Sequence, residues 1–209
     1  MARVTEIRRV GRSARRCAVV VDGEVALEAD AETLARFGVA PGKEFGEAEL
    51  EEMRQADETL QAGQAAARLL RYRGRSRGEM ERALQRKGYG EAAVSLTLER
   101  LERVGLINDE ALAERLAEGL RERKLGTRVV RQKMLQAGLG RELTEETLAE
   151  LGEEGEAGRA VALGEKYVAR SGGEDPARLR RRLYGYLARR GFDDGVCRQV
   201  LEQVLPAPD

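Results

Sequence analysis

The sequence predicts a mainly α-helical protein, in which a tandem array of three three-helix repeats comes after a small β-rich N-terminal segment. Two features indicate this class. Aromatic residues make up only 4% of the 209 residues and tryptophan is absent, so a core must come from Leu, Val and Ala, which suits helices better than a sheet sandwich. In addition, three segments about 50 residues apart share one apolar pattern around a glycine, which is typical of a repeat protein.

Residues 1–46 form the expected β-rich segment. The Val-rich runs "AVVV" and "EVAL" flank Asp22-Gly23, a dipeptide typical of a two-residue type I′ hairpin turn. The stretch "DAETLARFGV" then predicts one short helix that begins after Asp30 as N-cap and ends at Gly38. We expect about three strands, which would be marginal alone and should therefore pack on the helical region beyond residue 46.

The repeats are recognised from Gly88, Gly138 and Gly191, each of which comes after a helical stretch. Such a glycine ends a helix in the left-handed conformation, and the next apolar side chain folds back onto the core. The matching apolar positions are Leu84, Met134 and Leu187 before the glycine, and Tyr89, Leu139 and Phe192 after it. We assign most of these positions to the core.

The helical region divides into an acidic linker helix and the three repeats. The expected ranges are 47–61 for the linker and 62–107, 108–155 and 156–209 for the repeats. The second helix of each repeat should begin after Ser76, Thr127 and Asp175 as N-caps, with Pro176 in a first helical position. The Gly- and Glu-rich run 151–158 is expected to be a flexible joint before the third repeat.

Basic side chains are concentrated locally although the chain has 37 basic and 37 acidic residues. Residues 62–107 carry ten basic and five acidic side chains, and residues 159–209 carry ten and seven. Basic helix faces of this kind either bind an anionic partner or are simply solvated. The candidate partner-binding residues are Arg68, Arg71, Arg75, Arg82, Arg86, Lys87, Arg178, Arg181, Arg182, Arg189 and Arg190.

Several functional classes are disfavoured by composition. The chain has no histidine and two distant cysteines, Cys17 and Cys197, so neither a zinc site nor a disulfide framework is indicated, and we expect no cofactor. The carboxylates are expected on polar helix faces beside arginines rather than converging, so we expect no catalytic activity. No apolar run approaches the roughly 20 residues of a membrane span, and no secretory signal is evident, which indicates a cytoplasmic protein.

The order of these motifs resembles the RecX family. The local matches are "LLRYRGRSRGEMERALQRKGY", "GLINDEALAE", "GTRVVRQKMLQAGL" and "LARRGF", and the leader "LARFGVAPGKEF" is similar to that of longer members. Asp109 and Ala113 fit the family's link between the first two repeats. Leu112 stands where Phe is usual, and Ala137 where Lys or Arg is common.

This resemblance implies a curved array of three-helix units that binds the RecA–DNA filament and inhibits strand exchange, ATP hydrolysis and coprotease activity. It implies neither a cofactor nor catalysis. We expect a monomer whose partner is the RecA filament, with single-stranded DNA touched through its backbone. The alternatives are a helical DNA-binding module that acts without RecA, and a scaffold that binds no nucleic acid.

Overall fold

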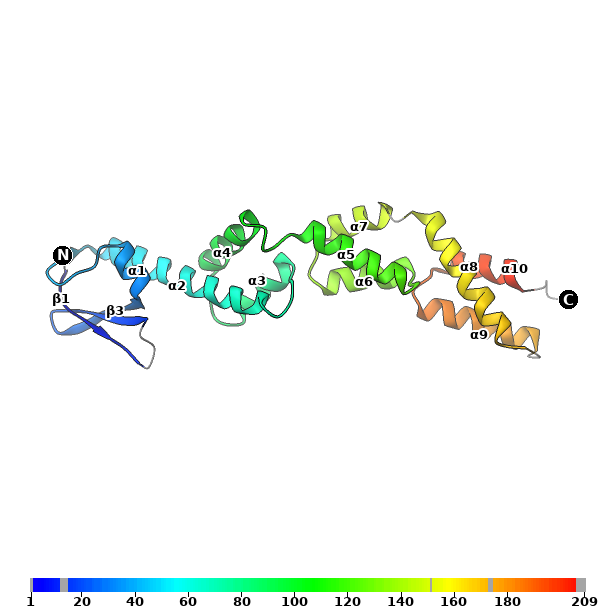
Figure 1. Cartoon of the computed structure of the whole chain (residues 1–209), viewed down its shortest axis with the longest axis horizontal. Helices are drawn as coiled ribbons and strands as arrows, with labels where there is room; N and C mark the ends of the chain where they lie inside the picture. The colour runs from blue at the N-terminus through cyan, green and yellow to red at the C-terminus, as the bar shows by residue number, and fades with distance from the viewer. Residues whose placement is uncertain (1, 12–14, 151, 173–174, 206–209) are drawn as a thin grey trace. The chain divides into compact units, whose positions relative to one another are not determined.

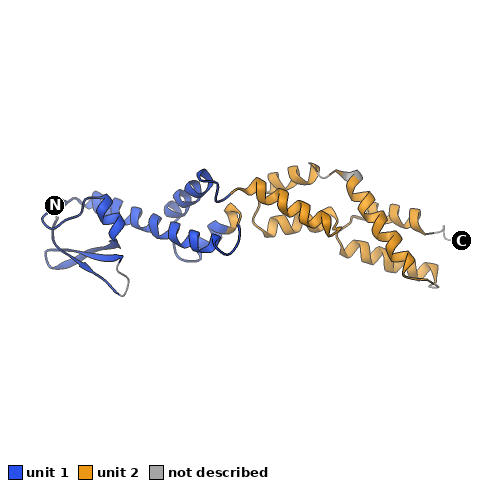
Figure 2. Ribbon diagram, in the orientation of Figure 1, with its two compact units in different colours: residues 1–74, 80–107 blue, residues 75–79, 108–209 orange. Residues whose placement is uncertain are grey.

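The computed structural model describes residues 2–11, 15–150, 152–172 and 175–205. They form two compact units (Figure 2). Unit 1 comprises Met1–Gly74 and Met80–Ile107, and unit 2 comprises Arg75–Glu79 and Asn108–Asp209. The start of helix α3 (Arg77–Gln85) thus belongs with unit 2, although the rest of that helix lies in unit 1.

Unit 1 begins with an antiparallel sheet in the strand order β3-β2-β1-β4 (Figure 1). The strands are β1 (Ala2–Arg9), β2 (Arg16–Val21), β3 (Glu24–Asp30) and β4 (Glu44–Phe45). Positive φ angles of 51° at Asp22 and 87° at Gly23 confirm the type I′ turn. The expectation of three strands is corrected to four among the described residues, because a two-residue strand is too short to show an alternating pattern.

Helix α1 (Ala31–Arg36) comes directly after strand β3. The Asp30 side chain accepts a hydrogen bond from the Glu32 N–H, which confirms it as the N-cap, and Gly38 has the expected positive φ of 61°. Together with the start of α2, this helix covers one sheet face. The core there consists of Val4, Cys17, Val19, Leu27, Ala29, Leu34, Phe45 and Met53.

A single helix, α2 (Glu47–Leu70), spans both the expected linker and the first helix of repeat 1. The linker prediction implied a helix that ends at residue 61, but α2 continues to Leu70. Ala65 and Ala66 are buried beside Val94 and Leu98 of the repeat core, so tertiary packing carries the helix through Gly63 despite the poor helix propensity of glycine.

The buried carboxylate of Asp57 in α2 is hydrogen-bonded to the N-terminal segment. Its Oδ2 accepts hydrogen bonds from Arg16 Nη1 (2.7 Å) and Gln61 Nε2 (2.6 Å). Its Oδ1 accepts them from the backbone N–H of Asp30 (2.6 Å) and from the Thr33 hydroxyl (3.2 Å). A charge buried to 3% exposure is tolerated because it is fully hydrogen-bonded.

Each repeat consists of three helices, as the sequence predicts. Repeat 1 uses the C-terminal part of α2, then α3 and α4 (Glu91–Arg103). Repeat 2 contains α5 (Asp109–Glu122), α6 (Thr127–Gln136) and α7 (Arg141–Glu150). Repeat 3 contains α8 (Glu153–Ala169), α9 (Pro176–Arg189) and α10 (Asp194–Val204). Each repeat has its own apolar core.

The glycine pattern that defined the repeats is confirmed in all three. The φ angles are 87° at Gly88, 85° at Gly138 and 92° at Gly191. After each glycine, the next residue's N–H donates to the carbonyl five residues earlier, as in a Schellman motif. These pairs are Tyr89 to Leu84 (3.4 Å), Leu139 to Met134 (3.2 Å) and Phe192 to Leu187 (3.3 Å).

Two details of the helix boundaries differ from the prediction. The N-cap of α6 is Gly126, not Thr127, which is instead the first helical residue. The run 151–158 is helical from Glu153 onward rather than an irregular joint; residue 151 lies outside the described residues. At the first of these boundaries, the Thr127 N–H donates to Glu156 of the next repeat, so a side chain outside α6 binds the free N–H at its start.

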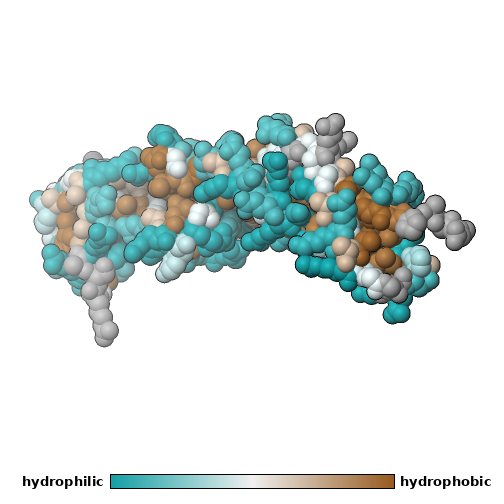
Figure 3. Space-filling model, turned by 45° about the vertical axis from the view of Figure 1, so that its right-hand side comes forward, coloured by the Kyte–Doolittle hydropathy of each residue, from teal (hydrophilic) through white to brown (hydrophobic). Residues whose placement is uncertain are grey.

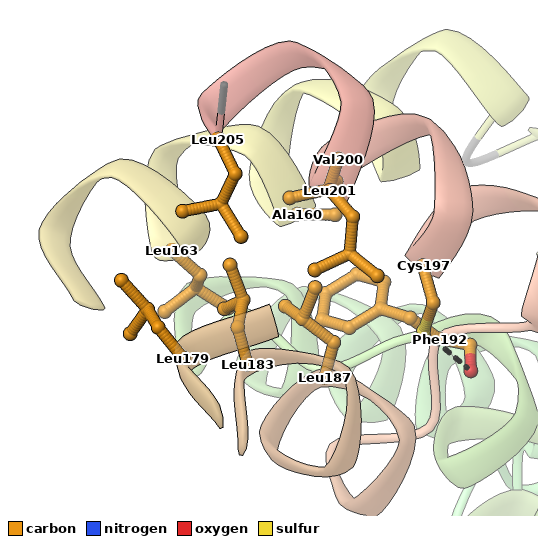
Figure 4. Close-up of a cluster of buried hydrophobic side chains, with 10 residues drawn as sticks. All are labelled: Ala160, Leu163, Leu179, Leu183, Leu187, Phe192, Cys197, Val200, Leu201 and Leu205. Atoms are coloured by element: carbon orange, nitrogen blue, oxygen red, sulfur yellow. Dashed lines mark hydrogen bonds between the residues drawn. The ribbon is translucent and has the colours of Figure 1, made fainter. Parts of the chain in front are cut away.

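The core of repeat 3 gathers side chains from all three of its helices (Figure 4). Phe192, which is 1% exposed, points among Leu183, Leu187 and Leu201. Burying a Leu or Phe side chain contributes roughly 1.5–3 kcal/mol, so this cluster holds the surface of α9 in place.

Both cysteines are free and buried, and the Cys197 thiol donates a 3.7 Å hydrogen bond to the Phe192 carbonyl.

Candidate binding surface on helix α9

Helix α9 presents an apolar face to the core and a basic face to solvent. Asp175 caps it by accepting the Arg178 N–H (2.9 Å), and Pro176 occupies the first turn, as expected. Leu179, Leu183 and Leu187 are buried, which leaves the arginines at the intervening positions outside. The periodicity of α9 thus separates core from candidate surface.

Four of the candidate arginines line one open hollow of about 560 Å³. We call it the arginine hollow; its described lining consists of Tyr167, Arg178, Arg181, Arg182, Gly185 and Arg189. No described lining residue is acidic. Because guanidinium groups stay charged at any working pH, the hollow concentrates positive charge at one place. It can therefore attract phosphate or carboxylate groups.

Gly185 shapes the floor of the arginine hollow. A Cβ atom there would lie 3.1 Å from Nη1 of Arg189, so the guanidinium of Arg189 occupies the space above the glycine. Glycine is otherwise unfavourable within a helix, by roughly 1 kcal/mol relative to alanine. Its position here gives Arg189 room to lie back over the preceding turn.

Arg190 is adjacent in sequence but has another role. Its Nη1 donates to the Arg123 carbonyl (3.1 Å), and its guanidinium lies 4.9 Å from the ring centre of Tyr186. Tyr186 in turn contacts Tyr167, with ring centres 5.0 Å apart. This cation–π and aromatic chain supports the wall of the arginine hollow and joins it to repeat 2.

The six candidates near repeat 1 lie in different surroundings. Arg68, Arg71, Arg82, Arg86 and Lys87 are exposed. Arg75 is half-buried and pairs with the carboxylate of Glu79, one helical turn further on. The structure thus engages Arg75 locally and leaves the other five at the surface.

Much of the face drawn in Figure 3 is polar, with apolar patches between, in keeping with a charged fraction of 35%. Tyr167 and Gly185 were not predicted as site residues, because a lone tyrosine and a helical glycine have ordinary core and structural uses. Gly185 lies one helical turn from Arg189 on α9, whereas Tyr167 comes from α8 and only the fold brings it beside the arginines.

Features of other functional classes are missing from the described ranges. No group of three or more His, Cys, Asp or Glu side chains there could hold a metal ion. No helix in the same ranges has the length and apolar character needed to cross a bilayer.

The fold and this surface define a class of tandem three-helix repeat proteins with a basic helix face. Family models match each repeat in turn: the first three-helix domain of RecX over residues 62–101, the second over 108–148 and the third over 154–201.

The chain also resembles individual RecX proteins. The regulatory protein RecX of Chlorobium phaeobacteroides (strain BS1) is 36% identical over 142 residues, which cover 67% of this chain and 91% of that one. Its counterpart in Clostridium beijerinckii is 23% identical over 207 residues, or 98% and 97% of the two chains. A crystal structure of a regulatory protein RecX gives a TM-score of 0.69 at 22% identity, covering 96% of this chain and 98% of that chain. The chain belongs to the RecX family.

Proposed function

We propose that this chain binds RecA–DNA filaments and inhibits the recombinase, ATPase and coprotease activities of RecA, and so modulates DNA repair and the SOS response. Its membership of a family of regulatory proteins supports a regulatory rather than a catalytic role. The arginine hollow supports an anionic partner, because four guanidinium groups line one site whose described residues include no carboxylate. Action in the cytoplasm and as a monomer belongs to the same proposal.

Both DNA and protein could supply the anion in such a filament. The arginine fork binds phosphates and carboxylates with similar geometry. Base readout is not expected, since the hollow offers mainly charge, and contacts to the phosphate backbone carry no sequence information. The arginine hollow is therefore proposed as a sequence-independent contact.

The test measures ATP hydrolysis by RecA on single-stranded DNA in the presence of this protein. Wild type should suppress hydrolysis, and the double variant Arg178→Glu with Arg189→Glu should need about tenfold more protein for the same effect, since each substitution reverses a charge in the hollow. The matched control is Arg115→Glu with Arg141→Glu on α5 and α7, where both arginines are exposed. It should behave as wild type.

Three results would count against the proposal. Unchanged hydrolysis with equimolar wild-type protein would remove RecA as the target. An equal loss of inhibition in the hollow variant and in the control variant would show that the effect comes from overall charge. A fall in helicity of the hollow variant, seen by circular dichroism, would make these arginines structural.

The alternative function is a DNA-binding module that acts without RecA. It is favoured by the same hollow and predicts direct binding whose affinity falls steeply with salt. A mobility-shift titration on single-stranded DNA at several salt concentrations separates the two functions. A scaffold without nucleic-acid partners would give no response in either assay.

A further inference from the structure

The N-terminus of α6 is capped by the next repeat rather than by its own flank. Its N-cap Gly126 has no side chain to accept a hydrogen bond. Instead, Glu156 from the first turns of α8 accepts the Thr127 N–H at 2.8 Å through Oε1 and bonds the Thr127 hydroxyl through Oε2. Glu156 is only 7% exposed, and a carboxylate is favoured beside the free N–H groups of a helix start.

The same contact recurs one repeat earlier, within unit 2. The N–H of Arg77, the first residue of α3, donates to Oδ1 of Asp109 at 2.8 Å. Asp109 is the first residue of α5, just as Glu156 lies near the start of α8. In both cases a carboxylate from the first helix of one repeat meets the second helix of the preceding one.

A second contact accompanies each carboxylate. The residue directly before α3 or α6 donates a hydrogen bond to a backbone carbonyl in the next repeat. That carbonyl belongs to the residue just before the Schellman glycine. The Ser76 hydroxyl donates to the Ala137 carbonyl at 2.6 Å, and the Gly126 N–H donates to the Arg190 carbonyl at 2.9 Å. The two junctions are therefore built on one plan, with a hydroxyl in the first and a backbone N–H in the second.

The two backbones approach each other closely at the second junction. A Cβ atom on Gly126 would lie 2.3 Å from the backbone of Gly191, and one on Gly191 would lie 2.5 Å from Val129. The Arg128 N–H donates to the Gly191 carbonyl (3.2 Å), and the Arg128 guanidinium donates to the Ala188 carbonyl (2.6 Å). The end of α9, which carries the arginine hollow, is thus fixed to the start of α6.

We propose that Glu156 is a positioning residue, which holds repeat 3 against repeat 2 and so keeps the arginine hollow in the arrangement that the filament requires. This proposal rests on the function proposed above. Binding to an extended partner costs less free energy when the contacting parts are already ordered relative to each other. The carboxylate supplies that order without touching the partner.

The test compares full-length variants at position 156 by two readouts. The first is amide hydrogen exchange at Thr127 and Arg128, measured by NMR, and the second is inhibition of the RecA ATPase. Glu156→Ala should speed exchange at these amides about tenfold or more and weaken inhibition several-fold, with exchange at Leu183 and Leu187 unchanged. Glu156→Gln, which keeps an acceptor oxygen for the Thr127 N–H, should recover most of both.

Glu165→Ala is the matched control, since Glu165 is an exposed carboxylate on the same helix, and it should alter neither readout. Unchanged exchange at Thr127 in Glu156→Ala would show that the cap does not form. Faster exchange throughout α8–α10 would make Glu156 a general core residue. Faster exchange at Thr127 with full inhibition would refute the positioning role. If wild type fails to inhibit RecA, the proposed function fails, and the exchange data still decide whether the junction is capped.

Discussion

The close approach between repeats makes Gly191→Ala a sharp test of the fold. At this position two costs combine. An alanine at a φ of 92° adopts the left-handed region at a cost of about 1–2 kcal/mol. Its Cβ would also lie 2.5 Å from Val129 Cγ2 and 2.7 Å from the Val129 backbone nitrogen. Because the backbone must move, overpacking adds about 1–3 kcal/mol.

Gly88→Ala is the matched comparison. Gly88 ends α3 in the same Schellman motif with a φ of 87°, yet an added Cβ would meet nothing within 4 Å. Only the conformational cost of about 1–2 kcal/mol applies there, so Gly191→Ala should be the more destabilising variant by roughly 1–3 kcal/mol.

The assay is urea unfolding monitored by hydrogen exchange in peptides from each unit, because Gly88 and Gly191 lie in different units. Each variant should destabilise its own unit. Equal losses of unfolding free energy at the two positions would refute the close approach of Gly191 to α6, and with it the rigid junction between repeats 2 and 3.

Three further predictions concern one core residue, one ion pair and one hydrogen bond. Leu183→Ala, at a fully buried site in repeat 3, should lower the unfolding free energy by about 2–5 kcal/mol, measured by urea denaturation; a loss below about 1 kcal/mol would contradict the packing in Figure 4. Asp57→Asn should leave Arg16 without its charged partner and cost about 1–3 kcal/mol, read as faster exchange in β2 and β3, with exposed Glu52→Gln as control. The Tyr184 hydroxyl donates to Asp194 (2.9 Å), which raises the pKa of Tyr184. Its stabilising contribution is present below the ordinary tyrosine pKa of about 10 and is lost as pH rises through the higher folded value. A titration of tyrosinate absorbance should show a late-titrating group that is absent in Tyr184→Phe. If the group lost in that variant instead titrates at the ordinary tyrosine pKa of about 10, the hydrogen bond is excluded.

Local signals allowed the repeat architecture to be predicted from sequence. Glycine is the residue that most readily adopts a positive φ after a helix, and the apolar residue after it then packs back onto the core, so the pattern around Gly88, Gly138 and Gly191 predicts three helix ends of one kind. The same holds for the Asp22-Gly23 turn and for the caps at Asp30 and Asp175. These features depend on neighbours within a few residues.

Contacts between residues far apart in the sequence could not be predicted from local patterns. Thr127 was predicted as the N-cap because threonine is a common capping residue. The carboxylate that caps α6 instead comes from Glu156, 29 residues away. Arg190 was predicted as a partner-binding residue like its neighbours. Its guanidinium instead donates a hydrogen bond to the backbone carbonyl of Arg123, 67 residues away. A basic stripe on one helix, with Gly185 beside it, could be predicted from periodicity, whereas the contribution of Tyr167 to the arginine hollow depends on how α8 and α9 pack.

Arginine footprinting of this chain on RecA–DNA filaments tests the central claim most directly. Phenylglyoxal modifies accessible guanidinium groups, and mass spectrometry would compare the free and the filament-bound protein. Arg178, Arg181 and Arg189 should become protected on binding, while the exposed Arg115 and Arg198 should react equally in both states. Bound protein with full reactivity at the three hollow arginines would contradict the account.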